Sequence, residues 1–194
     1  MAISRSGRNF FKRGKMENDV NVAYTLLSEH TAFHVKEAYK AMRTNVMFSV
    51  PNEGCKVIGV TSAVPSEGKS TTVLNLSITF AETGTKVLLI DADMRRPNIK
   101  KILNSGEGAG LSDVLARFVK AKEVIRPSGY ENLDVIFSGN IPPNPVELLA
   151  SDTMKDMIEE LKAEYDYIFI DTPPINVVTD ATVVSRLLHG IILI

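Results

Sequence analysis

The stretch "KVIGVTSAVPSEGKSTTVLNLSITFAET", residues 56 to 83, decides the fold. Its first seven residues are a β-branched run that predicts a strand, and its last fourteen space apolar residues as a helix does, up to Gly84. Between them lies "AVPSEGKST" (63–71), which fits the pattern G-x-x-x-x-G-K-[ST] except that Ala63 replaces the first glycine. Strand, loop and helix in this order predict a phosphate-binding loop.

The chemistry of this loop follows from its residues. Backbone N–H groups and a helix N-terminus both attract phosphate oxygens, and Gly68 lets the backbone approach them closely. We expect Lys69 to reach the β- and γ-phosphates of a nucleotide and the Ser70 hydroxyl to bind Mg²⁺. The expected cofactor-binding residues are Pro65, Ser66, Glu67, Gly68, Lys69, Ser70 and Thr71. The alternative is a strand-to-helix turn that contains Gly-Lys-Ser-Thr by chance.

Two further predicted strands end in acids. "VLLIDADMRRP" (87–97) contains Asp91 and Asp93, and "YIFIDTPP" (167–174) contains Asp171. Carboxyl ends of parallel strands share one edge, where open sheets bind ligands. Asp91 and Asp93 lie two apart in an extended segment, and close carboxylates repel each other unless a cation lies between them; Mg²⁺ at Ser70 would be that cation. Asp171 is expected to bind Mg²⁺ as the carboxylate that its strand delivers to the phosphates. One carboxylate would then act as a general base toward an attacking hydroxyl.

These charged residues could also have structural roles without catalysis or metal binding. Asp171 could cap a turn before the prolines. Asp93, Arg95 and Arg96 could form a solvated surface cluster.

The remaining chain alternates helices and strands. Strands are predicted at 86–90, 133–137, 165–171 and from Ile191, and helices at 32–49, 98–103, after 110 and at 151–164. Asn144 is expected to cap another helix that starts at Pro145. Mostly apolar strands that alternate with helices predict an α/β fold with a mostly parallel sheet and helices on both faces.

Composition limits the other readings. The chain has 194 residues, 44% of them hydrophobic, which suffices for one compact domain. A net charge of -1 gives no case for a nucleic-acid partner. A lone cysteine, Cys55, favours a reducing cytoplasmic setting.

Residues 1–31 are predicted to be a basic, flexible arm, either solvated or resting on an anionic membrane, with no transmembrane segment. Residues 32–194 read as the domain, which we expect to be truncated at its C-terminus because an apolar strand begins in "HGIILI".

Together, "AVPSEGKST", "VLLIDADMRRP" and "YIFIDTPP" resemble the Walker A, Walker A′ and Walker B motifs of bacterial tyrosine kinases of the CpsD/CapB type. The resemblance covers nearly the whole chain. It implies a P-loop NTPase fold and an ATP-dependent, autophosphorylating protein-tyrosine kinase in capsular and exopolysaccharide synthesis and export. It further implies that residues 68–71 bind ATP, that Ser70, Asp91 and Asp171 arrange Mg²⁺, and that Asp91 or Asp93 promotes attack by a tyrosine hydroxyl.

The same resemblance implies partners. "EAYKAMR" is similar to the family's E-x-x-R-x-x-R motif, which joins subunits into a ring; here Glu37, Lys40 and Arg43 occupy its charged positions. Lys40 cannot make the forked contact of an arginine, so the ring could be weak, and a plain solvent-facing helix is the alternative. A transmembrane chain-length regulator of the polysaccharide co-polymerase type is the implied activator. The five tyrosines form no terminal cluster of the kind that family members phosphorylate.

Two other functions stay open. A switch ATPase of the MinD/ParA type shares the fold, but such proteins carry a signature lysine where this chain has Val64, and glycine in place of Pro65. A nucleotide-binding scaffold without transfer activity is the other alternative.

Overall fold

A computed structural model of the chain describes residues 26–51 and 53–194. Within this part, one six-stranded sheet has the order β3-β4-β2-β5-β1-β6, and every pairing is parallel except that of β3 with β4. The strands are β1 (Lys56–Thr61), β2 (Val87–Asp91), β3 (Arg126–Pro127), β4 (Leu133–Ile136), β5 (Tyr167–Asp171) and β6 (Gly190–Leu193). The predicted α/β class with a mostly parallel sheet is confirmed.

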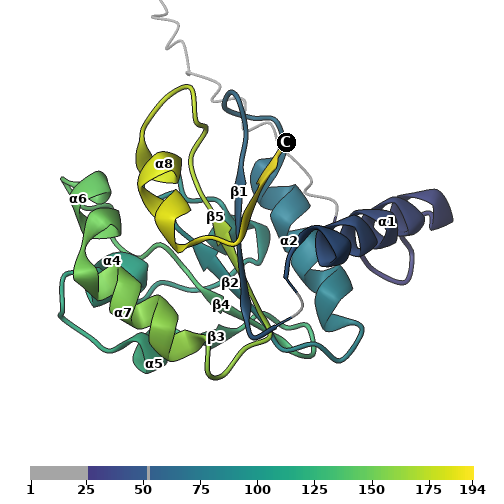
Figure 1. The fold of residues 1–194 in the computed structure, drawn as a ribbon, viewed down its shortest axis with the longest axis horizontal. Helices are drawn as coiled ribbons and strands as arrows, with labels where there is room; N and C mark the ends of the chain where they lie inside the picture. Colours follow the sequence, from purple (N-terminus) through teal and green to yellow (C-terminus); the bar gives the residue numbers. More distant parts are fainter. Residues whose placement is uncertain (1–25, 52) are drawn as a thin grey trace, which may run out of the picture.

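Helices cover both faces of the sheet (Figure 1). The helices α1 and α2 lie on one side, and α4 to α7 lie on the other (Figure 1). Their bounds are α1 (Phe33–Ser49), α2 (Lys69–Ala81), α3 (Ile99–Ile102), α4 (Leu111–Leu115), α5 (Ala121–Val124), α6 (Pro145–Ala150), α7 (Asp152–Leu161) and α8 (Asp180–Val184), followed by the 3₁₀ turn η1 (Ser185–Leu187). None of the helices in the described ranges combines the length and apolar character needed to cross a bilayer.

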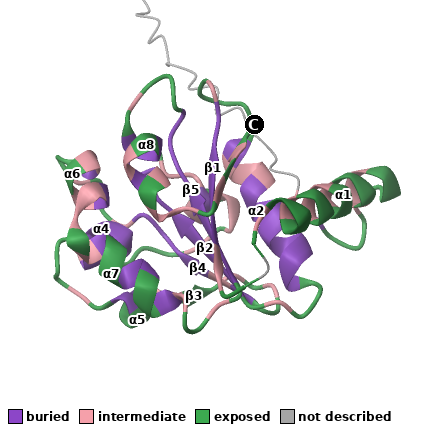
Figure 2. Cartoon of the chain, viewed as in Figure 1, coloured by how far each residue is buried: buried purple, intermediate pink, exposed green. Residues whose placement is uncertain are grey.

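Each central strand contributes side chains to two hydrophobic cores, one on each face of the sheet, because successive side chains point to opposite faces. On β2, Leu88 and Ile90 join the cluster under α4 to α8, whereas Val87 and Leu89 join the cluster under α1 to α3. All five residues of β2 and of β5 are buried, which explains their nearly unbroken apolar sequence. Figure 2 shows these strands buried, while α1 is exposed along most of its length.

Register places the acids side by side. Asp91 at the end of β2 is the partner of Asp171 at the end of β5, and Asp171 is in turn the partner of Val60 on β1. The Ala92 N–H then donates to the Asp171 carbonyl oxygen over 2.8 Å. The strand that precedes the phosphate loop and the two strands that end in acids are therefore neighbours.

Two local predictions were wrong in detail. Asn144 does not cap α6 with its side chain; its Nδ2 donates to Glu147 Oε2 over 2.6 Å, while Pro145 does take the first helical position. The helix predicted from Ser151 to Glu164 begins with Ser151 as a cap, whose hydroxyl accepts from the Met154 N–H, and it ends at Leu161.

The amino-terminal arm falls mostly outside the described residues, so its boundary at residue 31 stays a prediction. Of the described part, Leu27 is buried in the core and its N–H donates to Asn75 Oδ1 on α2 over 2.9 Å.

Candidate nucleotide-binding site

The helix α2 presents an open N-terminus at the end of the phosphate loop. Its N-cap is Gly68, in the left-handed region with φ 83°, and no side chain caps it. The first N–H groups of a helix have no partner within the helix, so this end attracts an anion. Ser66 also has a positive φ of 70°, an unfavourable backbone conformation for a residue with a side chain. Glu67 Oε2 closes the loop by accepting from the Val64 N–H over 3.0 Å.

Lys69, the first residue of α2, is buried between two acids. Its Nζ lies 2.5 Å from Asp171 Oδ1 and 3.8 Å from Asp93 Oδ2, and only 7% of its side chain is exposed. The Ser70 hydroxyl donates to the other oxygen of Asp171 over 2.7 Å. The structure thus brings together Lys69, Ser70, Asp93 and Asp171 from three strand ends, as the sequence predicted; their roles remain predictions.

Asp91, like Asp171, is fully enclosed by the protein. Its carboxylate is completely buried and accepts from the backbone N–H groups of Asp93 and Ile99, each over 3.3 Å. Burial raises the pKa of Asp91 well above its usual value, and the neighbouring Asp171 carboxylate adds to the rise. Burial also raises the pKa of Asp171, although the Lys69 ammonium acts in the opposite direction.

The charge of this group suits a cation. Three carboxylates face one ammonium, so two negative charges are uncompensated when all four groups are ionised. The hydroxyl and carboxylate oxygens of Ser70 and Asp171 are ligands that Mg²⁺ prefers. The described residues contain no His, Cys, Asp and Glu cluster that could hold a metal alone, and Mg²⁺ usually completes its shell with water and substrate phosphates. The donor set therefore fits a magnesium ion bound together with a nucleotide.

The structure adds Asp180, which the sequence did not single out. Arg95 forms a forked ion pair with Asp180 at the start of α8, with Nε 3.1 Å from Oδ2 and Nη2 3.2 Å from Oδ1. The surface-cluster alternative is thus wrong for Arg95, whose partner is completely buried. An acid at the start of a helix in "VVTDATVV" was the only sequence signal, and it says nothing about Arg95, which lies 85 residues earlier.

The three charged residues of the predicted ring motif do not act alike. Glu37 and Lys40 form an exposed ion pair of 2.8 Å within α1. Arg43 lies against α2 instead, where its Nη1 donates to the Thr79 carbonyl oxygen over 2.6 Å.

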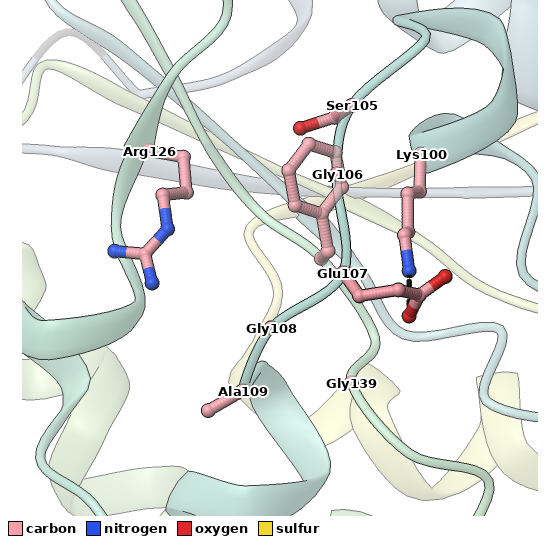
Figure 3. A pocket seen from close by; sticks show the side chains of 9 residues that line it. Lys100, Ser105, Gly106, Glu107, Gly108, Ala109, Arg126 and Gly139 are labelled. Carbon is pink, nitrogen blue, oxygen red and sulfur yellow. Dashed lines mark ion pairs between the residues drawn. The ribbon is translucent and has the colours of Figure 1, made fainter.

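Two hollows lie away from the phosphate loop. One, between the segment from Lys100 to Ala109 and Arg126, has a volume of about 30 Å³, and an ion pair between Lys100 and Glu107 lies on the side of it away from Arg126 (Figure 3). It is too small for a nucleotide. The other is a groove of about 580 Å³ between α1 and β6. Neither is lined by a residue of the phosphate loop.

Comparisons with known proteins identify the family. A family described as "AAA domain" matches residues 55–186. Tyrosine-protein kinase YwqD of Bacillus subtilis is 42% identical over 158 residues, which is 81% of this chain and 67% of that protein. CpsD of Streptococcus pneumoniae serotype 4 is 41% identical over 160 residues, which is 82% of this chain and 70% of that protein. The chain belongs to the bacterial tyrosine-kinase family of the CpsD and CapB type.

Solved structures agree with this family assignment. The kinase domain of the Escherichia coli tyrosine kinase ETK superposes with a TM-score of 0.78 at 36% identity, over 81% of this chain and 62% of that one. MinD of Pyrococcus horikoshii, solved with Mg-ADP, is more distant, with a TM-score of 0.61 at 28% identity over 72% of this chain and 57% of that one. The predicted P-loop NTPase fold is confirmed, and the tyrosine-kinase family lies nearer than the MinD type.

Proposed function

We propose that this chain is an ATP-dependent protein-tyrosine kinase that regulates capsular and exopolysaccharide synthesis and export. The observation that carries the proposal is the burial of Lys69 between Asp171 and Asp93 at the open N-terminus of α2. Family membership supports the same activity, since YwqD and CpsD are named tyrosine-protein kinases.

The phosphate loop would hold ATP. Residues 66–71 would surround the phosphates with backbone N–H groups, after Pro65, which has no N–H to donate, and Lys69 would contribute an ammonium to the β- and γ-phosphates. Ser70 and Asp171 would hold Mg²⁺ with Asp91 beside them, and the ion would neutralise charge that develops on the phosphates.

Asp93 is the better candidate for the general base. In the reaction, the tyrosine oxygen bonds to the γ-phosphorus, the bond from phosphorus to the ADP oxygen breaks, and the tyrosine proton passes to a carboxylate. Asp91 has no exposed surface and already accepts two backbone N–H groups, whereas Asp93 keeps 6% of its surface accessible and has Oδ2 turned toward Lys69. A base must reach the proton it takes, so we assign this role to Asp93.

The two alternatives predict other outcomes. A switch ATPase would pass the phosphoryl group to water, but Val64 and Pro65 stand where the MinD type carries lysine and glycine. A scaffold would bind nucleotide and transfer nothing.

The partners proposed for the kinase follow from the family. The activator would be a transmembrane chain-length regulator, whose cytoplasmic end would recruit the kinase to the inner face of the plasma membrane. Subunits would assemble into a ring through Glu37, Lys40 and Arg43.

The test supplies Mg-ATP, a tyrosine-rich peptide and the cytoplasmic segment of such a regulator. We expect phosphotyrosine with the unmodified chain, none with Lys69→Met, and a fall of about 10²-fold or more with Asp93→Asn. Asp134→Asn is the matched control, because Asp134 binds the Tyr165 hydroxyl near the amino ends of the strands and should not affect the rate. Phosphotyrosine that survives Lys69→Met would refute the proposal.

A further inference from the structure

The ion pair of Arg95 with Asp180 joins the loop after β2 to the start of α8. Arg95 lies in the loop after β2, and Asp180 lies beyond the loop after β5. The contact is forked, and it is the arrangement in which an arginine binds a carboxylate most firmly. Asp180 has no exposed surface, while 39% of the Arg95 side chain is exposed.

Asp180 is a fixed anchor for this contact. It is the first residue of α8, and both Ala181 and Val184 of that helix are buried in the core. A buried carboxylate without a partner is costly, so Asp180 holds Arg95 in place as firmly as α8 itself is held.

Arg95 in turn belongs to the turn that orients Asp93. The Arg96 N–H donates to Asp93 Oδ1 over 3.0 Å, which closes a tight turn around Arg95. The other oxygen of Asp93 faces Lys69 Nζ. A shift of the backbone at Arg95 would therefore displace the Arg96 N–H that holds the Asp93 carboxylate.

We propose that Arg95 is a positioning residue: through its ion pair with Asp180, it holds the turn that aims Asp93 at the reaction centre. This inference rests on the proposed function, because it assigns Arg95 to the base of the kinase reaction. A purely structural ion pair would stabilise the fold equally whether or not Asp93 were present.

A double-mutant cycle between Arg95 and Asp93 separates these cases. We expect Arg95→Gln to lower kcat by about 10- to 100-fold while nucleotide affinity stays within about twofold, since misplacing a catalytic group by 1 Å can cost that much. In an Asp93→Asn background, the same change should cost less than about threefold, because a residue that acts through Asp93 has nothing left to position. Equal losses in both backgrounds would overturn the inference.

Further variants guard against unfolding. Arg95→Lys keeps the charge and should retain part of the rate, and Asp180→Asn should reproduce the Arg95→Gln defect from the other side. Asp134→Ala is a control for stability alone, since it removes a hydrogen bond to Tyr165 away from the site; a rate loss equal to that of Arg95→Gln would contradict positioning.

A second test measures hydrogen exchange and does not depend on kinase activity. Hydrogen exchange of the Arg96 amide should speed up at least tenfold in Arg95→Gln and stay unchanged in Asp134→Ala, because that amide is held by Asp93. An unchanged rate in Arg95→Gln would overturn the inference. If the unmodified chain transfers no phosphate to tyrosine, the proposed function fails, and the exchange result still decides whether Arg95 positions Asp93.

Discussion

Lys69 carries more of the site than any other single residue. It is the first residue of a helix with no side-chain cap, and it is the cation nearest to two acids that arrive from other strands. A lysine has a compact charge on a long stem, so it can bind a carboxylate or a phosphate by turning a few bonds. We infer that Asp171 holds the Lys69 ammonium at the place where the phosphates of ATP would need it.

Cys55 allows a prediction that concerns one residue only. Burial raises the pKa of its thiol from 9.0 to about 11. The thiolate is the reactive form, so alkylation by iodoacetamide at pH 8 should be about 100-fold slower than for an unperturbed thiol.

The same shift affects stability at high pH. The folded chain binds the thiol proton more tightly than the unfolded chain, so the free energy of unfolding should fall as pH rises from 9 to 11. Cys55→Ser should remove that part of the slope. A labelling rate equal to that of a free thiol would contradict the prediction.

At this scale, the sequence predicted which residues would meet at the site. Asp91 and Asp171 each end an apolar strand, Asp93 follows Asp91 by two residues, and the ends of neighbouring parallel strands share one edge of the sheet. The pairing of Arg95 with Asp180 could not be predicted, because no periodic pattern links residues 85 positions apart.

The approach of α4 to β4 depends on a glycine. The Leu111 N–H donates to the Phe137 carbonyl oxygen over 2.8 Å, which draws the start of α4 against the end of β4. A Cβ on Gly110 would overlap that oxygen and the backbone nitrogen of Gly139. Backbone atoms cannot move aside as the end of a side chain can.

Gly110→Ala should therefore be strongly destabilising, by about 2 kcal/mol or more, which is typical of overpacking in a rigid site. Gly106→Ala in the same loop is the control, because nothing lies within 4 Å of a Cβ there, and it should stay within about 0.5 kcal/mol. Urea denaturation of both variants measures this. Equal midpoints would show that the loop adapts.

Long elements were easier to predict than short ones. The helix expected at 32–49 is α1 within one residue, because a repeating apolar pattern runs along it. The short elements α5 and β3 were missed, since four and two residues are too few to show a period. The Asn144 side chain donates to the Glu147 side chain and does not accept from the backbone N–H groups of α6. Both hydrogen bonds are local, and the sequence does not indicate which of them forms.

At the scale of the whole molecule, the proposed ring depends on which charges α1 can offer. Arg43 is bound to α2 through the Thr79 carbonyl oxygen, and Lys40 is paired with Glu37. Exposed pairs of this kind are weak, so a neighbouring subunit could replace Glu37 as the partner of Lys40 at little cost.

We expect Lys40→Arg to strengthen self-association and Arg43→Ala to abolish it, because a guanidinium can bind a carboxylate through two hydrogen bonds. Mass in solution at high protein concentration measures this. Lys36→Ala on the same helix is the control, since Lys36 Nζ donates to the Glu29 carbonyl oxygen of its own chain. A monomeric mass that is the same for the unmodified chain, Lys40→Arg and Arg43→Ala would exclude the ring.

The whole fold serves to bring three strand ends together. The strands β1, β5 and β2 are adjacent, and their carboxyl ends carry the phosphate loop, Asp171 and the pair Asp91 and Asp93. Both faces of the sheet are packed, so this edge is the part of the strands that remains available for chemistry.

The most direct test of this account measures where the γ-phosphoryl group goes. The unmodified chain, Mg-ATP labelled at the γ-phosphate, the regulator segment and excess tyrosine peptide are mixed, and phosphotyrosine, free phosphate and ADP are quantified together. The account predicts about one phosphotyrosine for each ADP formed, and neither product with Lys69→Met. ADP formed with all of the label in free phosphate would contradict a kinase and favour the switch ATPase.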